Sequence, residues 1–369
     1  MEQTKIGVIG CGVISGIYLK NCQLFENLEI VACADLIKER AEKRASEFGI
    51  PQACSVDEVL ANEEIRLVIN LTLPQTHTSV DLQILSANKN VYSEKPLALN
   101  KKDAKRVLDL AAEKRLRVGC APDTFLGAGI QTCRKILDEG WIGEPVSAAA
   151  FMMNHGHESW HPDPEFYYKS GGGPLFDMGP YYLTALINLL GPVKRVSGMT
   201  KISFPQRTIT SEAKYGSAID VEVPTFTAGT LGFENGVIGT LTTTFDVWAH
   251  KMPFIEIYGS AGTLRVPDPN TFGGTPSIKR AGHDDWAEVP LLYSFVENSR
   301  GVGISDMADA IQGDKPFRAW GELAFHVLDI MESIHLSAQT GHHLELDSHC
   351  QKPAPMPLNQ SFQEKTWKI

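Results

Sequence analysis

Residues 5–35 constrain the fold of this chain more than any other segment. A short apolar run breaks into Gly10-Cys11-Gly12, an amphipathic segment follows, and a second apolar run ends in Asp35. Short runs rich in β-branched residues are typical of buried parallel strands. The order of strand, glycine turn, helix, strand and acid predicts the first half of a nucleotide-binding, doubly wound α/β domain.

Each part of this unit has a physical task toward a dinucleotide. Gly10 permits the tight turn from strand to helix, and Gly12 lets the backbone approach a pyrophosphate. The helix that follows offers unpaired N–H groups and the positive end of its dipole to that anion. Asp35 can accept hydrogen bonds from the adenosine ribose, and its charge repels the 2′-phosphate of NADP. We therefore expect NAD as the cofactor.

Two details of the unit depart from the simplest pattern. The third fingerprint position holds Ser15, with Gly16 one place late. A small residue suffices where the helix packs closely on the strand, so we expect this departure to be minor. Lys38 and Arg40 follow Asp35 closely and keep NADP open as the less favoured cofactor, although both residues also suit the solvated start of a helix.

Composition limits the class of protein. The 369 residues suit two domains of ordinary size, and 43% hydrophobic with 21% charged residues is usual for globular chains. A net charge of −10 argues against nucleic acid or anionic membranes as partners. We find no signal-like N-terminus, no apolar run that could cross a bilayer and no C-x-x-C among the seven cysteines. These features predict a reduced, cytoplasmic protein.

The chain is predicted to fold into two domains. Residues 1–122 alternate strand-like and helix-like segments, which predicts a Rossmann domain with a parallel sheet. Residues 123–350 contain long strand-like runs and an Asn235-Gly236 hairpin turn, which predict an α+β domain on a large, mostly antiparallel, open-faced sheet. The free face needs a cover, so we expect a homodimer or homotetramer formed through it. Residues 351–369 are predicted to be an extended tail.

The same patterns locate individual elements. Strands are expected at 5–9, 29–34, 66–71, 91–93 and 117–121, and then at 146–153, 226–233, 237–245, 254–258 and 263–266. Helices are expected at 38–48, 76–88, 101–114, 129–139, 183–190 and 320–338. Gly49 and Gly140 predict the ends of the first and fourth of these helices.

Glu94, Lys95 and Pro96 follow the predicted strand at 91–93. Ligands of open α/β sheets bind at this carboxyl edge. A lysine there can place its ammonium over the nicotinamide crevice, where burial lowers the pKa of an amine. The alternative from the residues alone is a surface ion pair beside a proline turn.

Taken together, these motifs resemble the Gfo/Idh/MocA family, the group of glucose–fructose oxidoreductase and inositol dehydrogenase. The resemblance covers nearly the whole chain. It rests on the glycine turn at 10–12, the loop TLPQTH at 72–77, the Glu-Lys-Pro signature at 94–96, the segment GGGPLFDMGPY at 171–181 and a less specific turn at 257–264. It implies an NAD(P)-dependent dehydrogenase acting on a hydroxyl or keto carbon of a sugar, cyclic polyol or similar small molecule.

The resemblance implies catalytic roles for Lys95, Asp177 and Tyr181. In such enzymes the corresponding residues surround the nicotinamide and the reacting carbon, and a cis bond commonly precedes Pro96. Most members have histidine where this chain has Tyr181, although some branches use tyrosine. A phenol is a poor base at pH 7 unless a nearby cation lowers its pKa. Either Tyr181 transfers the proton while Lys95 tunes it, or Tyr181 is a neutral donor while Lys95 or a water takes the proton.

Further residues are assigned to the two ligands. We expect the cofactor to be bound by Gly10, Gly12, Val13, Ile14, Asp35, Thr72, Pro74, His77, Glu94 and Lys95. We expect the substrate to be bound by Asp123, His155, His157, Trp160 and Tyr168. For His77, a capping or packing role is the alternative. Asp123 lies in a stretch that departs from the family pattern, as does Leu73, which stands where proline is usual.

Asp177 and Tyr181 are four positions apart, so a continuous helix would present both on one face. Pro180 between them is tolerated only if the helix begins near Asp177. Asp177 would then lie at or beside the N-cap, and spacing alone leaves capping and catalysis equally open.

Residues 154–163 contain three histidines and two carboxylates and follow a predicted strand. They can form a metal site, a solvated loop or a sugar-binding loop. No distant ligand pair is evident, so we expect no metal. The nearby Trp160, Tyr167, Tyr168 and Lys169 favour the sugar-binding loop, because aromatic faces and convergent donors suit polyol rings.

Two functions of other classes remain open. Some relatives keep NAD tightly bound and use transient oxidation to drive the redox-neutral cleavage of glycosides. Others are non-catalytic nucleotide sensors that bind a regulatory protein. The intact Lys95, Asp177 and Tyr181 argue against a sensor.

Overall fold

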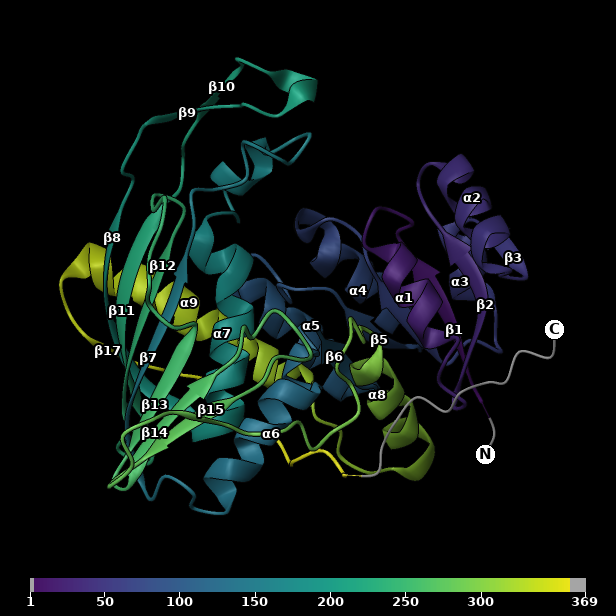
Figure 1. The fold of residues 1–369 in the computed structure, drawn as a ribbon. Coiled ribbons are helices and arrows are strands. Elements are labelled where there is room, and N and C mark those ends of the chain that lie inside the picture. The colour runs from purple at the N-terminus through teal and green to yellow at the C-terminus, as the bar shows by residue number, and fades with distance from the viewer. Residues whose placement is uncertain (1–2, 359–369) are drawn as a thin grey trace. The chain divides into compact units, whose positions relative to one another are not determined.

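The protein was analysed as a computed structural model, which describes residues 3–358 (Figure 1). The chain divides into two compact units. Within the described residues, the first unit contains 3–128, 293–325 and 356–358, and the second contains 129–292 and 326–355. The sequence predicts a continuous first domain that ends at 122, whereas in the structure residues 293–325 also belong to the first unit. Residues 351–358 contain no helix or strand, and the rest of the predicted tail lies outside the described residues.

The first unit is built on a six-stranded sheet in which every pairing is parallel, as predicted. Its order is β3-β2-β1-β4-β5-β6, which reverses between β1 and β4. Nucleotides bind at the carboxyl ends of strands at such a reversal. The strands are β1 (Thr4–Ile9), β2 (Leu28–Ala34), β3 (Gln52–Cys54), β4 (Leu67–Asn70), β5 (Asn90–Ser93) and β6 (Val118–Cys120).

Two helices of this unit begin and end where local sequence signals place them. α2 and α5 have the predicted bounds, and α2 stops at Gly49, whose φ of 64° suits glycine. The short β3 and α3 were not predicted. The helices are α1 (Ser15–Cys22), α2 (Lys38–Phe48), α3 (Val56–Ala61), α4 (His77–Ser86), α5 (Lys101–Lys114) and α8 (Val302–Gly313), with short 3₁₀ turns at Pro74–Thr76 and Thr124–Leu126.

The second unit contains a nine-stranded sheet of order β16-β15-β14-β13-β7-β12-β11-β8-β17. Only β7 and β12 pair in parallel, so the prediction of a mostly antiparallel sheet is confirmed. The strands are β7 (Pro145–Met153), β8 (Val193–Lys201), β11 (Phe226–Phe233), β12 (Ile238–Thr244), β13 (Ile255–Gly259), β14 (Gly262–Val266), β15 (Ser277–Arg280), β16 (Ala287–Glu288) and β17 (Leu344–Glu345).

Helices cover one face of this sheet (Figure 1). They are α6 (Ala128–Asp138), α7 (Pro174–Leu190) and α9 (Gly321–Thr340). At Gly198 of β8 a Cβ atom would lie only 2.7 Å from Ile334 of α9, so glycine is needed where the helix meets the sheet. Among the helices of residues 3–358, none combines the length and the apolar character that a bilayer crossing requires.

The chain makes a long excursion between β8 and β11, although these strands are antiparallel neighbours. Residues 202–225 carry a separate two-stranded sheet of β9 (Gln206–Thr208) and β10 (Ala218–Asp220), with a 3₁₀ turn at Glu212–Lys214. This small sheet stands at the end of the large one in Figure 1. We call residues 202–225 the clasp, because they hold the loop that follows β7.

Candidate active site

The glycine turn after β1 has the shape that a dinucleotide requires. Gly10 has a φ of 101°, and a Cβ atom there would lie 2.6 Å from the carbonyl carbon of Leu71. No other residue fits this position without moving the backbone. At Gly12, by contrast, no atom beyond its own two chain neighbours lies within 4 Å of the Cβ position, which leaves room for an anion beside the N-terminus of α1.

Ser15 and Arg44 close this turn from behind. Ser15 Oγ donates a hydrogen bond to the carbonyl oxygen of Gly12 over 2.7 Å. Arg44 donates from Nε to Ser15 Oγ and from Nη2 to the Gly12 carbonyl, each over 3.1 Å. The serine at the third fingerprint position therefore braces the turn. Arg44 was missed from the sequence, where it reads as one charge on the exposed side of α2.

Asp35 is fixed beside the turn by two backbone groups. The N–H of Cys11 donates to Oδ2 over 2.8 Å, and the N–H of Ile37 donates to Oδ1 over 2.9 Å. Val13 and Leu36 are each 96% exposed at the same carboxyl edge of the sheet. Apolar side chains this exposed mark a surface that another ring or chain covers. These residues fit an adenosine, with its ribose on the carboxylate.

The loop after β4 is held by a buried polar network. Thr72 donates to Asn70 Oδ1 from both its N–H and its hydroxyl, and Asn70 Nδ2 donates to Asp81 Oδ1 over 2.7 Å. Ser93 Oγ donates to the same Asp81 oxygen over 3.1 Å. Asp81 is fully buried, and its lost hydration raises the pKa of its carboxyl to about 7.

His77 links this loop to the Glu-Lys-Pro segment. Its side chain is 0% exposed, with Nδ1 2.7 Å from the Pro96 carbonyl oxygen and Nε2 3.1 Å from that of Thr72. The expectation that this ring binds the cofactor is therefore wrong, because it has no accessible surface. His77 instead fixes the two loops that carry Thr72 and Lys95, which is the packing role that the sequence left open.

Glu94 positions Lys95. Its Oε1 accepts from the Tyr18 hydroxyl over 2.7 Å, and its Oε2 accepts from the Lys95 N–H over 2.9 Å. The Lys95–Pro96 bond is cis, as the family resemblance implies. Lys95 is half-buried at the carboxyl edge of β5, the position that the sequence predicts for it.

Asp123 has a different place from the predicted one. It is 1% exposed, and its Oδ2 accepts from the N–H groups of Gly301 and Gly303 over 2.8 and 3.0 Å. Burial raises the pKa of this carboxyl to about 6. The assignment of Asp123 to substrate binding is therefore wrong, because its carboxylate caps the start of α8.

Asp177 and Tyr181 lie one turn apart inside α7. The helix begins at Pro174 with Gly173, not Asp177, as its N-cap, and Pro180 lies within it. Of the two roles that spacing left open for Asp177, capping is therefore excluded, and the helix begins at Pro174 and not at the expected start near Asp177. A proline in the first helical position is a usual start signal, and Pro174 is the sequence feature that would have located it. Asp177 lies in the first turn of the helix.

His157 lies against Asp177 in a cage of rings. Its Nε2 is 3.5 Å from Asp177 Oδ2. The ring stacks on Tyr167 with centroids 3.7 Å apart and meets the edge of Phe245 at 4.8 Å. The loop after β7 thus brings one of its three histidines to the carboxylate of α7, and the surrounding rings fix its orientation.

The other predicted substrate residues separate into two groups. Trp160 is 63% exposed beside His157, and His155 is half-buried under the ring of Trp248. Tyr168 is 0% exposed and packs under the guanidinium of Arg207, so its assignment to the substrate is wrong. In residues 3–358 we find no group of three histidine, cysteine or carboxylate side chains arranged to hold a metal ion.

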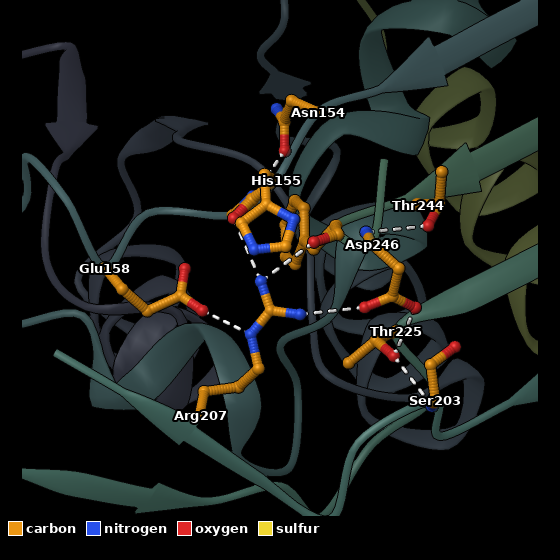
Figure 2. A network of polar contacts seen from close by, with 10 residues as sticks. Asn154, His155, Glu158, Ser203, Arg207, Thr225, Thr244 and Asp246 are labelled. Atoms are coloured by element: carbon orange, nitrogen blue, oxygen red, sulfur yellow. Dashed lines mark hydrogen bonds and ion pairs between the residues drawn. The ribbon is translucent and has the colours of Figure 1, made fainter. Parts of the chain in front are cut away.

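Arg207 of the clasp organises this loop (Figure 2). Its Nε donates to Glu158 Oε1, and its Nη1 donates to Asp246 Oδ1 over 2.9 Å. Its Nη2 donates to the carbonyl oxygens of His155 and Phe245, each over 2.9 Å. Four N–H groups of one buried guanidinium therefore tie together the segments on either side of His157. No local pattern marks Arg207 in the sequence.

More of the clasp contacts the same loop. The carbonyl oxygen of Glu158 accepts from the N–H groups of Thr210 and Ser211 over 3.0 and 2.7 Å. Lys214 pairs with Asp163 over 2.7 Å. The loop is therefore held along its length and presents a fixed surface next to Asp177.

Comparisons with known proteins agree with this geometry. Residues 4–121 match the family described as oxidoreductase family, NAD-binding Rossmann fold, and residues 130–265 match the GFO/IDH/MocA C-terminal domain. The chain is 27% identical over 300 residues to inositol 2-dehydrogenase 3 of Saccharopolyspora erythraea, covering 77% of this chain and 80% of that one.

Solved structures share the fold. An NAD-binding oxidoreductase of Klebsiella pneumoniae superposes with a TM-score of 0.81 at 20% identity, over 93% of this chain and 99% of that one. A levoglucosan dehydrogenase in complex with NADH and L-sorbose gives 0.79 at 17% identity, over 94% and 99%. The resemblance noted in the sequence is confirmed: this chain belongs to the GFO/IDH/MocA family of oxidoreductases and carries its NAD-binding Rossmann domain.

Proposed function

We propose that this protein is an NAD-dependent dehydrogenase acting on a hydroxyl or keto carbon of a sugar, cyclic polyol or similar small molecule. The observation that carries the proposal is the pair on α7, where Asp177 lies 3.5 Å from His157 and Tyr181 follows one turn later. A carboxylate beside an imidazole, with a phenol one helical turn away, can hold and move a proton. Relatives named inositol 2-dehydrogenase support a polyol substrate.

The roles follow from the side chains. NAD, when bound, supplies the hydride acceptor. Tyr181 exchanges the proton of the substrate hydroxyl, while Asp177 and His157 orient that hydroxyl. Membership of the family supports a catalytic role for Lys95 as well. The seven cysteines are free thiols, which supports a cytoplasmic location.

The test is to follow NADH absorbance with a panel of sugars, inositols, glycosides and dihydrodiols. We expect net NADH with at least one of them. Lys95→Met should lower turnover by ~10² or more while NAD still binds. Lys102→Met, an exposed lysine of the same unit, is the matched control.

Other results would identify the rival functions. Cofactor that survives purification, with substrate consumed but no net NADH, would favour redox-neutral cleavage. NAD binding without turnover of any compound would favour a sensor. Wild-type turnover in Lys95→Met would remove Lys95 from the mechanism.

We also propose a homodimer or homotetramer formed through the open face of the large sheet. Gly198 faces α9, so its neighbour Met199 points to the opposite face, where it is 80% exposed. Ile238 of β12 is 56% exposed. Light scattering after gel filtration should give an oligomer, and Met199→Lys with Ile238→Lys should shift it toward monomer.

A further inference from the structure

The second unit contains a groove that the proposed chemistry does not use. Its volume is about 550 Å³, and it lies between the loop after β7 and the clasp. Gly156 and Glu158 line it from the loop, and Trp248, which follows β12, lines it as well. The side chain of Trp248 was not singled out from the sequence.

Trp248 forms an aromatic platform at this groove. Its ring stacks on His155 with centroids 3.4 Å apart and planes inclined by 16°. The side chain is nevertheless 83% exposed, so most of the surface that His155 does not cover faces solvent. His155 is itself held, because its carbonyl oxygen accepts from Arg207. A tryptophan that is braced on one side and open on the other is suited to stack against a flat ligand.

The charge of the groove excludes anionic ligands. Its charged lining groups are Glu158 and Arg207, which pair with each other. Arg207 also donates hydrogen bonds to Asp246 and to two backbone carbonyl oxygens. A phosphate or carboxylate would need an uncommitted cation, and this lining offers none. The lining therefore favours a neutral ligand over an anionic one.

The rim of the groove carries hydrogen-bonding groups. Ser159, Thr208 and Thr210 line it, and within residues 3–358 their hydroxyl groups make no hydrogen bond to the protein. Gln206 also lines it, and its Nε2 donates to Asp220 over 2.8 Å, which leaves its Oε1 oriented as an acceptor. A neutral ligand with one apolar face and a rim of hydroxyl groups matches this arrangement, and a pyranose ring has that form.

The groove shares its loop with the proposed reaction site. Gly156 and Glu158 line the groove, while His157 between them lies against Asp177. We propose that the groove binds a second glycosyl unit, so that the preferred substrate is a disaccharide or other glycoside, oxidised on the ring next to Asp177. This inference rests on the proposed dehydrogenase function and narrows its substrate class.

The experiment compares Trp248→Ala with Trp286→Ala. Trp286 is 37% exposed in the same unit, under Arg265 and outside the groove, so its variant is the matched control. Calorimetry with NADH-loaded protein would measure binding of maltose, cellobiose, lactose and p-nitrophenyl glucoside, with glucose and galactose as single rings. Equal thermal midpoints of the two variants would show that both fold.

We expect the wild type to bind at least one two-ring ligand about tenfold more tightly than its single ring. Trp248→Ala should lose that advantage and keep its affinity for the single ring within twofold, while Trp286→Ala should match the wild type. Steady-state KM values should show the same pattern: a lower KM for the two-ring ligand than for its single ring in the wild type and Trp286→Ala, and no such difference in Trp248→Ala.

Two outcomes would overturn the inference. One is a wild type that prefers no two-ring ligand, and the other is a preference that survives in Trp248→Ala. Either result with net NADH from a single sugar leaves the dehydrogenase proposal intact. Trp248-dependent binding of a two-ring ligand without any turnover would instead contradict the dehydrogenase proposal and support the groove.

Discussion

Nη2 of Arg207 donates a hydrogen bond to the carbonyl oxygen of His155 over 2.9 Å. A side chain of the clasp thereby fixes the backbone two residues before the histidine that lies against Asp177. The side chains of Arg207, Glu158 and Asp246 are only 5–8% exposed, so this ion-pair network is shielded from solvent. Removing its cation would leave two buried carboxylates uncompensated.

Arg207→Met should therefore destabilise the protein by about 3–5 kcal/mol. Arg207→Lys keeps the charge but loses the planar fork, so its stability should be intermediate and its kcat should fall more than its KM rises. Urea unfolding and steady-state kinetics would measure both effects. Arg106→Met, which removes an exposed ion pair with Asp103, is the control. An unchanged unfolding midpoint for Arg207→Met would contradict the prediction.

Tyr181→Phe removes one hydroxyl from α7 and should lower kcat by ~10² or more if this phenol exchanges the proton. Tyr182→Phe changes the next residue, which is 2% exposed, and should stay within about threefold of the wild type. Turnover at saturating NAD and substrate is the measurement. If Tyr181→Phe keeps the wild-type rate, Lys95 or a water takes the proton.

Asp35→Ala removes the acceptor that Cys11 and Ile37 hold in place. We expect kcat/KM with NAD to fall about tenfold, because the ribose loses a charge-assisted partner. The value with NADP should hold or rise, since the repulsion of its phosphate is gone. Asp57→Ala, an exposed residue of the same unit, should leave the NAD/NADP ratio unchanged. A ratio that also stays constant in Asp35→Ala would exclude Asp35 from cofactor choice.

The buried carboxyl of Asp81 predicts a pH dependence of stability. Its pKa is raised from 3.8 to about 7, so between these values the folded protein keeps a proton that the unfolded chain releases. Stability should therefore fall as the pH rises through this window. Cys120 of β6 adds no charge here, because its own pKa is raised well above the ordinary value by burial.

Asp81→Asn keeps the acceptor for Asn70 and Ser93 and cannot ionise. Between pH 4 and 7 the thermal midpoint of this variant should fall less than that of the wild type. At pH 8 the variant should be more stable than the wild type. Asp109→Asn, at an exposed site that pairs with Lys105, should keep the wild-type slope. Parallel curves for Asp81→Asn and the wild type would show that another group titrates.

Local sequence patterns were sufficient to predict much of the fold. α2 ends where Gly49 adopts a left-handed conformation, and α5 begins where Asn100 accepts from the N–H of Asp103. The glycine turn and Asp35 could likewise be predicted, because they belong to one short segment of the chain, whereas the cis bond before Pro96 was expected only from the family resemblance. The prediction of Lys95 at the edge of β5 follows from the same local frame.

Features that depend on contacts between residues far apart in the sequence could not be predicted. β8 was missed because Gly198 looks like a turn residue, whereas it is small to admit Ile334. α8 was missed because the carboxylate that caps it belongs to Asp123. Asp123 and Tyr168 look like polar residues available to a ligand, and only the folded structure buries them. The role of Arg207 was missed for the same reason, because its hydrogen-bond partners belong to two other segments of the chain.

The cap on α8 also bears on how this protein can be made. Gly303 lies 180 positions after Asp123, so a ribosome completes the whole parallel sheet, and then nearly all of the second unit, before the N–H groups that donate to Asp123 are synthesised. Until then Asp123 lacks the two N–H donors that hold its carboxyl in the folded protein. A gene fragment that stops at residue 128 would encode that unfinished state permanently, and joining it to 293–325 through a short linker is the shortest route to an autonomous NAD-binding module.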